Sequence, residues 1–166
     1  MRFAVDTMLG RLGRWLRIVG QDAAYGPHLA GRMLVGLARR DGRVILTRDT
    51  RLVRQRHLPP CLFIESDRFR EQLRQVVAAY DLDVGAALFT RCLECNEPLR
   101  EAPRASAEPR VPAYVWTTQE RFYACPKCGR LFWPATHLAR ARAELARLGL
   151  LPAAPGDSGG PGQSPR

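Results

Sequence analysis

Two Cys-x-x-Cys pairs constrain the fold of this 166-residue chain more than any other feature. Cys92 and Cys95 form the first pair, Cys125 and Cys128 form the second, and 29 residues lie between them. Two residues between cysteines allow both thiolates to reach one tetrahedral Zn²⁺. In a chain that is not exported, such pairs indicate a metal site before disulfides. The pattern therefore predicts that the four thiolates bind one zinc ion.

The predicted zinc ion would stabilise a small β module and would not take part in catalysis. Four thiolates leave no open coordination position, and zinc contributes on the order of 10 kcal/mol to the folding of such modules. We expect ribbon strands at 111–118 and 122–133, and an exposed loop at 101–110. A redox dithiol is the alternative, but neither pair starts a helix in a βαβ unit. Cys61 is expected to be a small core residue.

The first half of the chain alternates between apolar strand patterns and amphipathic helix patterns. We expect strands at 2–5, 21–25, 42–49 and 61–64, and helices at 7–19, 29–40, 50–55 and 68–80. Such alternation predicts an α/β fold, with a parallel sheet covered by helices on both faces. A further amphipathic helix is expected at 136–148, after the second cysteine pair.

An aspartate accompanies each predicted strand: Asp6, Asp22, Asp49 and Asp67. Because parallel strands point the same way, we expect these four acids to share one edge of the sheet. Like charges gathered there repel unless a cation offsets them, which predicts a Mg²⁺ or Mn²⁺ site. The alternative is that each acid caps the helix that follows it.

The helix after Asp6 has two opposite faces. On a helical wheel the apolar arc and the basic arc are Leu9, Leu12, Leu16 and Val19 against Arg11, Arg14 and Arg17. The chain has 26 basic and 16 acidic residues, and this net charge of +10 favours a polyanionic partner such as nucleic acid. Exposed arginines could hold phosphate groups, although an ordinary solvated face is the alternative.

The sequence gives no sign of a membrane or export signal. It contains no run of about 18 apolar residues, and a strand pattern begins at once after Met1. We therefore expect a soluble, cytoplasmic protein. Residues 151–166 are rich in Pro, Gly and Ser, which predicts a disordered tail.

Several motifs in this order resemble those of a known family: VDTMLGRLGRWLRIVGQD, GRVILTRD, ESD with Gln72 soon after, RCLECNEPL and CPKCGRLFWPATH. They run through most of residues 1–140 and are similar to the PIN-like ribonucleases known as the Mut-seven C-terminal RNase domain. The resemblance implies a three-layer PIN-like nuclease domain with a parallel sheet at 1–85. It also implies a zinc ribbon with a C-terminal helix at 86–150, followed by the tail at 151–166.

The resemblance also implies a function, namely a Mg²⁺- or Mn²⁺-dependent ribonuclease that hydrolyses RNA phosphodiester bonds by in-line attack of water. Asp6 and Asp49 match the acids expected to bind the metal, with Asp67 as a third catalytic acid. The zinc ribbon would aid RNA binding. The arginines expected to orient the phosphate backbone are Arg11, Arg14, Arg17 and Arg48.

Two stretches depart from the family pattern. Members usually carry acids just before or in the second helix, whereas PHLAGRML at 27–34 has none. His28 could substitute there, and the alternative is an ordinary solvated loop histidine. WPATH has Ala135 where the family tends to have Gly, and His137 is expected to be structural rather than a fifth zinc ligand. The missing acid keeps a second hypothesis open: a non-catalytic RNA-binding protein with a degenerate PIN-like site.

Overall fold

The computed structural model of the chain describes residues 1–134 and 136–152. Ala135 and most of the expected tail, 153–166, lie outside the described residues. None of the helices within the described residues is long and apolar enough to cross a membrane.

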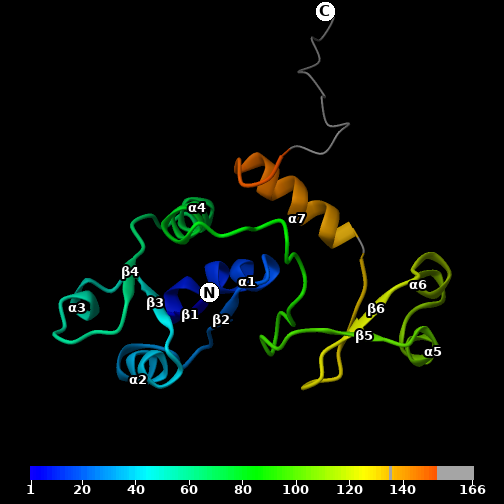
Figure 1. The fold of residues 1–166 in the computed structure, drawn as a ribbon, viewed down its shortest axis with the longest axis horizontal. Coiled ribbons are helices and arrows are strands. Elements are labelled where there is room, and N and C mark those ends of the chain that lie inside the picture. The colour runs from blue at the N-terminus through cyan, green and yellow to red at the C-terminus, as the bar shows by residue number, and fades with distance from the viewer. Residues whose placement is uncertain (135, 153–166) are drawn as a thin grey trace, which may run out of the picture.

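A four-stranded sheet forms the centre of the N-terminal part (Figure 1). All neighbouring strands pair in parallel, in the order β2-β1-β3-β4, which confirms the predicted α/β class. In the central strand, Phe3 lies between Ala23 of one neighbour and Val44 of the other. The strands are β1 (Arg2–Val5), β2 (Asp22–Ala24), β3 (Val44–Thr47) and β4 (Cys61–Phe63).

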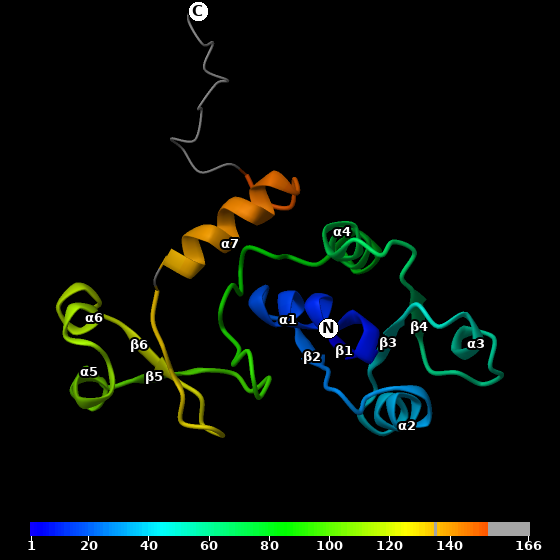
Figure 2. The same ribbon diagram turned by 180° about the vertical axis from the view of Figure 1, so that it is seen from behind.

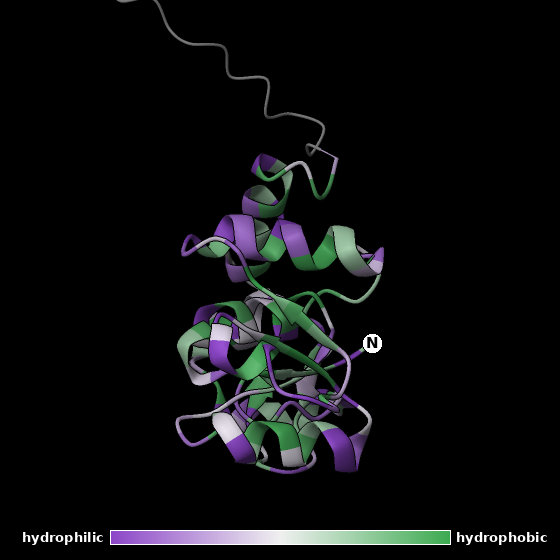
Figure 3. Cartoon of the chain, turned by 90° about the vertical axis from the view of Figure 1, so that its left-hand side faces the viewer, coloured by the Kyte–Doolittle hydropathy of each residue, from purple (hydrophilic) through white to green (hydrophobic). Residues whose placement is uncertain are grey.

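Helices cover both faces of this sheet, so the fold has three layers (Figures 1 and 2). One face is covered by α1 (Gly10–Ile18) and α4 (Phe69–Tyr80), with α7 (Thr136–Arg147) packed on these helices, and the other by α2 (Gly31–Asp41) and α3 (Thr50–Val53). Phe3 belongs to the first apolar core and Ala4 to the second, because successive side chains of a strand point to opposite faces. Figure 3 shows these apolar strands in green between the helix layers.

The C-terminal part contains a three-stranded antiparallel sheet, in the order β5-β6-β7. Its strands are β5 (Arg100–Ala102), β6 (Phe122–Ala124) and β7 (Leu131–Phe132). Between β5 and β6 the chain forms α5 (Arg104–Ala107), a 3₁₀ turn (Glu108–Arg110) and α6 (Ala113–Thr118).

Two predictions for this region are wrong. Residues 111–118 were expected to form a strand, but Pro112 precedes α6, where its fixed backbone angle suits the start of a helix. Residues 101–110 do not form an exposed loop throughout, because Ala107 is buried with Val115 and Phe122 in a third apolar core. The chain between the cysteine pairs therefore builds its own small core.

Helix α7 packs on the N-terminal part, although it follows the small sheet in sequence. Leu145 and Leu148 belong to the same apolar core as Phe3. Arg70 forms an ion pair with Glu144 at 2.5 Å, and Arg74 donates a hydrogen bond to the carbonyl of Leu148. The domain boundary near residue 85 stays a prediction. The chain passes from the N-terminal part to the small sheet near this residue, and it returns with α7, whose Leu145 is buried in the N-terminal core.

Candidate functional site

Asp6 and Asp49 lie at the carboxyl edge of the parallel sheet, directly after β1 and near the end of β3. Thr47, the last residue of β3, connects them. Its hydroxyl donates a hydrogen bond to Asp6 Oδ2 at 2.5 Å and accepts one from the backbone N–H of Asp49 at 3.0 Å. The N–H of Asp6 also donates to the carbonyl of Leu46. The structure therefore places both acids at the same edge of the sheet, where Thr47 links the Asp6 side chain to the backbone of Asp49.

Asp6 is almost fully buried, with 3% of its surface exposed. Its second oxygen, Oδ1, accepts a hydrogen bond from the Thr7 hydroxyl at 3.2 Å. Among residues 1–134 and 136–152, no basic side chain forms an ion pair with Asp6. A buried carboxylate without a cationic partner is costly, so this group provides a place where a cation is stabilising.

Asp49 is also the N-cap of α3. Its Oδ1 accepts hydrogen bonds from the backbone N–H groups of Arg51 at 2.8 Å and Leu52 at 3.2 Å. Asp49 Oδ1 therefore caps the helix, as the alternative to metal binding predicted for this acid. Within the described part of the chain, no hydrogen bond reaches Oδ2. One carboxylate oxygen of Asp49 consequently remains available as a ligand.

Two further predicted site residues, Arg48 and Asp67, follow β3 and β4 at the same edge of the sheet. Arg48 Nη1 donates hydrogen bonds to the carbonyls of Ile64 and Glu65, so its half-buried side chain connects the ends of β3 and β4. Asp67 is exposed and lines a groove of about 580 Å³ together with Met8 and Arg11. Among the described residues, Asp6, Asp49 and Asp67 do not form a group close enough to share one ion.

Asp22 lies at the opposite end of the sheet, so the prediction that it shares the carboxyl edge is wrong. It is the first residue of β2 and pairs with Arg2, the first residue of β1. Its carboxylate forms ion pairs with Arg43 and Arg2 and accepts a hydrogen bond from Asn96. Burial alone would raise the pKa of Asp22, but the hydrogen bonds of Arg43 and Asn96 bring this pKa below its usual value.

Arg11 and Arg14 are exposed as predicted, whereas Arg17 is buried, and the expectation of a third phosphate-binding arginine on this face is wrong. The guanidinium of Arg17 stacks on the Tyr25 ring, 4.0 Å from its centroid. It donates hydrogen bonds to three carbonyls, those of Ala23, Leu93 and Glu94, at 2.7 to 2.9 Å. Burial lowers the pKa of Arg17.

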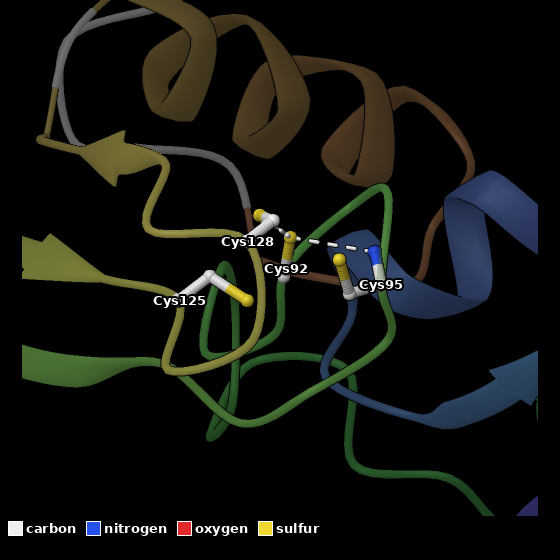
Figure 4. Close-up of side chains that lie close together, drawn as sticks. All are labelled: Cys92, Cys95, Cys125 and Cys128. Carbon is white, nitrogen blue, oxygen red and sulfur yellow. Dashed lines mark hydrogen bonds between the residues drawn. The ribbon is translucent and has the colours of Figure 1, made fainter.

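The four cysteines of the two pairs meet in space, as Figure 4 shows. Their sulfur atoms lie within 4.8 Å of one another, and those of Cys92 and Cys128 are 3.8 Å apart. Four sulfurs placed tetrahedrally about 2.3 Å from a zinc ion would be about 3.8 Å apart. The cluster could therefore bind zinc. Within the described residues it is the one group of three or more ligating side chains that could hold an ion.

The thiols of this cluster influence one another's ionisation. The backbone N–H of Arg130 is the main reason that the pKa of Cys128 falls to about 7. The pKa of Cys95 rises to about 12, chiefly through its hydrogen bond with Cys128. Thiolates so close together need a positive ion, which fits the chemistry of a Cys₄ zinc site.

The sequence motifs and the geometry agree with a family comparison. A family model described as the Mut7-C RNAse domain matches residues 1–145. The chain belongs to this family. Family membership indicates a ribonuclease-type function with RNA as the substrate. No curated protein and no solved structure matches the chain.

Two residues on which the arrangement depends, Thr47 and Asn96, are not among the predicted site residues. The motif GRVILTRD could have indicated Thr47, because there a hydroxyl side chain ends an apolar strand two residues before the aspartate. The signal for Asn96 is weaker, since it follows CLEC in place of the glycine that follows CPKC. Its contacts with Asp22 and Ala23 join residues more than 70 positions apart, and no local pattern predicts such contacts.

Proposed function

We propose that this protein is a ribonuclease that uses Mg²⁺ or Mn²⁺ at the carboxyl edge of its parallel sheet. The observation that carries the proposal is the Thr47 hydroxyl, which holds the segments of Asp6 and Asp49 together. Asp6 and Asp49 would be the metal ligands, and Asp67 a third acid beside the substrate. The match of residues 1–145 to an RNase family supports the same activity.

The residues at this edge fit a hard divalent cation. They offer carboxylate oxygens, which Mg²⁺ and Mn²⁺ prefer to sulfur or imidazole ligands. Asp6 is buried beside hydroxyl groups, and Asp49 Oδ2 is open. When bound, the ion would activate a water molecule and offset the negative charge that develops during phosphodiester hydrolysis.

The chain's own groups would position the RNA. Arg11 and Arg14 are exposed on α1, which follows the 3₁₀ turn Thr7–Leu9 after Asp6, so they would hold phosphates next to the scissile one. Arg48 would contribute from the end of β3. Arg17 has no part in this binding, because three carbonyls occupy its guanidinium.

The second candidate is an RNA-binding protein that does not cleave. One observation favours it: the segment before α2 reaches the acid edge, where the N–H of Thr7 donates to the carbonyl of Leu29, but residues 27–34 supply no carboxylate. The one imidazole in this segment is that of His28, which is exposed. Such a protein would bind RNA with the same salt dependence, about −0.7 per phosphate contacted on a logarithmic scale.

A cleavage assay separates the two candidates. Zinc-loaded protein is incubated with end-labelled single-stranded RNA, with and without Mn²⁺, beside the variants Asp6→Asn and Asp49→Asn. We expect metal-dependent cleavage that falls about 100-fold in either variant. The matched control is Asp83→Asn, because Asp83 Oδ1 also accepts two backbone N–H bonds but lies outside the sheet edge. RNA that stays intact under all conditions, while still being bound, would establish the second candidate.

A further inference from the structure

A groove of about 710 Å³ lies between α1, α4 and α7 on one side and the small C-terminal sheet on the other. This volume is in the range of pockets that bind small organic groups. Six of its lining side chains are aromatic: Trp15, Phe69, Phe89, Tyr123, Phe132 and Trp133. Aromatic rings in such number indicate a surface for flat, apolar groups.

The apolar cores do not account for most of these rings. Phe69, Phe89, Tyr123 and Phe132 belong to none of the three apolar cores found in the described residues. Tyr123 and Phe132 are directly paired across β6 and β7, so their side chains project from the same face of the sheet. All four rings are half-buried. They therefore present ring surface to the groove without being needed to fill a core.

Phe69 is part of a layered platform. Its ring stacks on Trp15 with centroids 5.8 Å apart and planes inclined by 27°. The guanidinium carbon of Arg11 lies 3.7 Å from the Phe69 centroid. Rings and guanidinium planes layered in this way are the groups on which unpaired nucleobases stack in proteins that bind single strands.

The charges around the groove favour an anionic ligand. Arg11, Arg14, Arg70 and Arg140 line it. Glu144 is its one acid among the described lining residues, and Arg70 and Arg147 already neutralise it. In residues 1–134 and 136–152, Arg14 and Arg140 are exposed and form no ion pair, so both are available to phosphates.

The groove adjoins the smaller groove beside Asp67. Arg11, Phe69 and Arg70 also line the smaller groove that contains Asp67. Arg11, Arg14 and Ile18 recur along one face of α1, and Arg11 lines both grooves, so this helix leads from the smaller groove into the larger one. A single strand could therefore lie along α1 with one part at the acids and the next part in the groove.

We propose that this groove is the site where the protein binds unpaired bases of its RNA, next to the cleavage site. The inference rests on the proposed function for the identity of the polymer, but the groove could bind RNA whether or not the acids cleave it. Bases of a duplex are paired and stacked on one another, so they cannot stack on these rings. The groove thus predicts a preference for single-stranded substrates.

The test measures binding of a fluorescent ten-nucleotide RNA to full-length, zinc-loaded protein by anisotropy, without added Mg²⁺ or Mn²⁺. We expect Tyr123→Ala and Phe132→Ala each to weaken binding by about tenfold, since stacking of one base is worth roughly 5- to 150-fold. Arg14→Gln should weaken binding less and reduce its salt dependence. Zinc content and circular dichroism show whether each variant is folded.

Matched controls exist outside the groove. Tyr114 is 70% exposed on α6, so Tyr114→Ala removes an aromatic ring of the same kind and should leave binding unchanged. Arg54→Gln removes an exposed arginine that does not line the groove. Equal losses for Tyr114→Ala and Tyr123→Ala, or equal affinity of the wild type for a duplex, would overturn the proposal.

Cross-linking of the unmodified protein keeps the test independent of any folding defect. RNA with 4-thiouridine is irradiated on the wild-type protein, and cross-linked residues are mapped by mass spectrometry. We expect cross-links at Phe69, Tyr123 or Phe132. Cross-links only outside the groove contradict the proposal. It is also contradicted if Tyr123→Ala abolishes self-association of the protein but leaves RNA binding unchanged. Groove-dependent binding without cleavage would refute only the proposed ribonuclease activity.

Discussion

Cys92 and Cys125 begin two turns that have the same backbone structure. In each turn the N–H four positions later donates to the cysteine carbonyl at 2.9 Å, from Asn96 in the first and Gly129 in the second. Both donors are left-handed, with φ of 65° and 69°. Glycine and asparagine are the residues that adopt this conformation most easily. Local sequence alone is therefore enough to form both turns.

The surroundings of the two turns differ. The Asn96 side chain donates to Asp22 Oδ1 at 2.6 Å and accepts from the backbone N–H of Ala23 at 3.1 Å. Ala23 lies in β2, an edge strand whose outer N–H and C=O would otherwise have no partner strand. Gly129, in contrast, has no neighbouring atom within 4 Å of the place where a side chain would begin.

The first turn is thus joined to the edge of the parallel sheet, and the second is not. Arg17 strengthens the join, because it donates to Ala23 on one side and to the carbonyls of Leu93 and Glu94 in the first turn on the other. Since a zinc ion would hold both turns, its loss should also disturb β2. The following predictions test that difference between the turns.

The largest effect is expected from removal of zinc with a chelator. A structural Cys₄ site contributes about 10 kcal/mol or more to its module, so β5, β6 and β7 should unfold. Hydrogen exchange should show that the amide of Ala23 also loses protection, by at least tenfold, because its acceptor is Asn96. The amide of Asp6, which donates to Leu46 inside the sheet, should stay protected. If the exchange rate at Ala23 is unchanged after zinc removal has unfolded β5, β6 and β7, the turn that begins at Cys92 does not stabilise the edge strand β2.

Replacement of Arg17 by Met should destabilise the zinc-loaded protein by about 3 kcal/mol, because three carbonyls lose a charged donor. The measurement is urea unfolding of the holoprotein. Arg14→Met is the matched control on the exposed face of the same helix, and it should change the free energy of unfolding by no more than about 0.5 kcal/mol. Similar losses for the two variants would mean that the join at Arg17 carries no particular stability.

Exchanging the two left-handed residues separates side-chain contacts from backbone conformation. Asn96→Gly keeps the conformation but removes the bonds to Asp22 and Ala23, so it should cost about 1 to 2 kcal/mol. Gly129→Asn places a tolerated side chain in open space and should cost less than about 1 kcal/mol. Thermal unfolding of both zinc-loaded variants checks the asymmetry. A larger loss at Gly129 would indicate that backbone strain dominates.

The same contrast explains which features the sequence could predict. The parallel sheet follows from a continuous apolar run such as 44–46, and the cysteine cluster follows from spacing, so both signals are local. Helix α6 was missed because the apolar residues of 111–118 also suit a strand, and only Pro112 indicates a helix start.

The sequence could predict the positions of only those site residues that follow the end of a strand. Asp6 and Asp49 follow their strands directly or nearly so, and the edge they share is a consequence of parallel pairing. Asp22 was misplaced although its strand was expected at 21–25 and lies at Asp22–Ala24. An acid near the start of a parallel strand lies at the amino edge of the sheet, so the position of the acid within the strand decides its edge. Arg17 was misplaced because a helical wheel contains no information about a turn 76 residues later that covers the helix.

The smallest predicted effect concerns the acid side of the pH range. The pKa of Asp22 is lowered in the folded protein, so its contacts stabilise the fold above the unfolded-state pKa of about 4. This contribution is lost as the pH falls through the lower, folded-state pKa. Unfolding temperatures of the wild type and Asp22→Asn should therefore differ most above pH 5 and converge below pH 4. Asp83→Asn serves as the control, since Asp83 is exposed and does not contact the first turn. A wild-type advantage that persists at low pH would mean that the Asn96 amide, and not the carboxylate charge, fixes the first turn to β2.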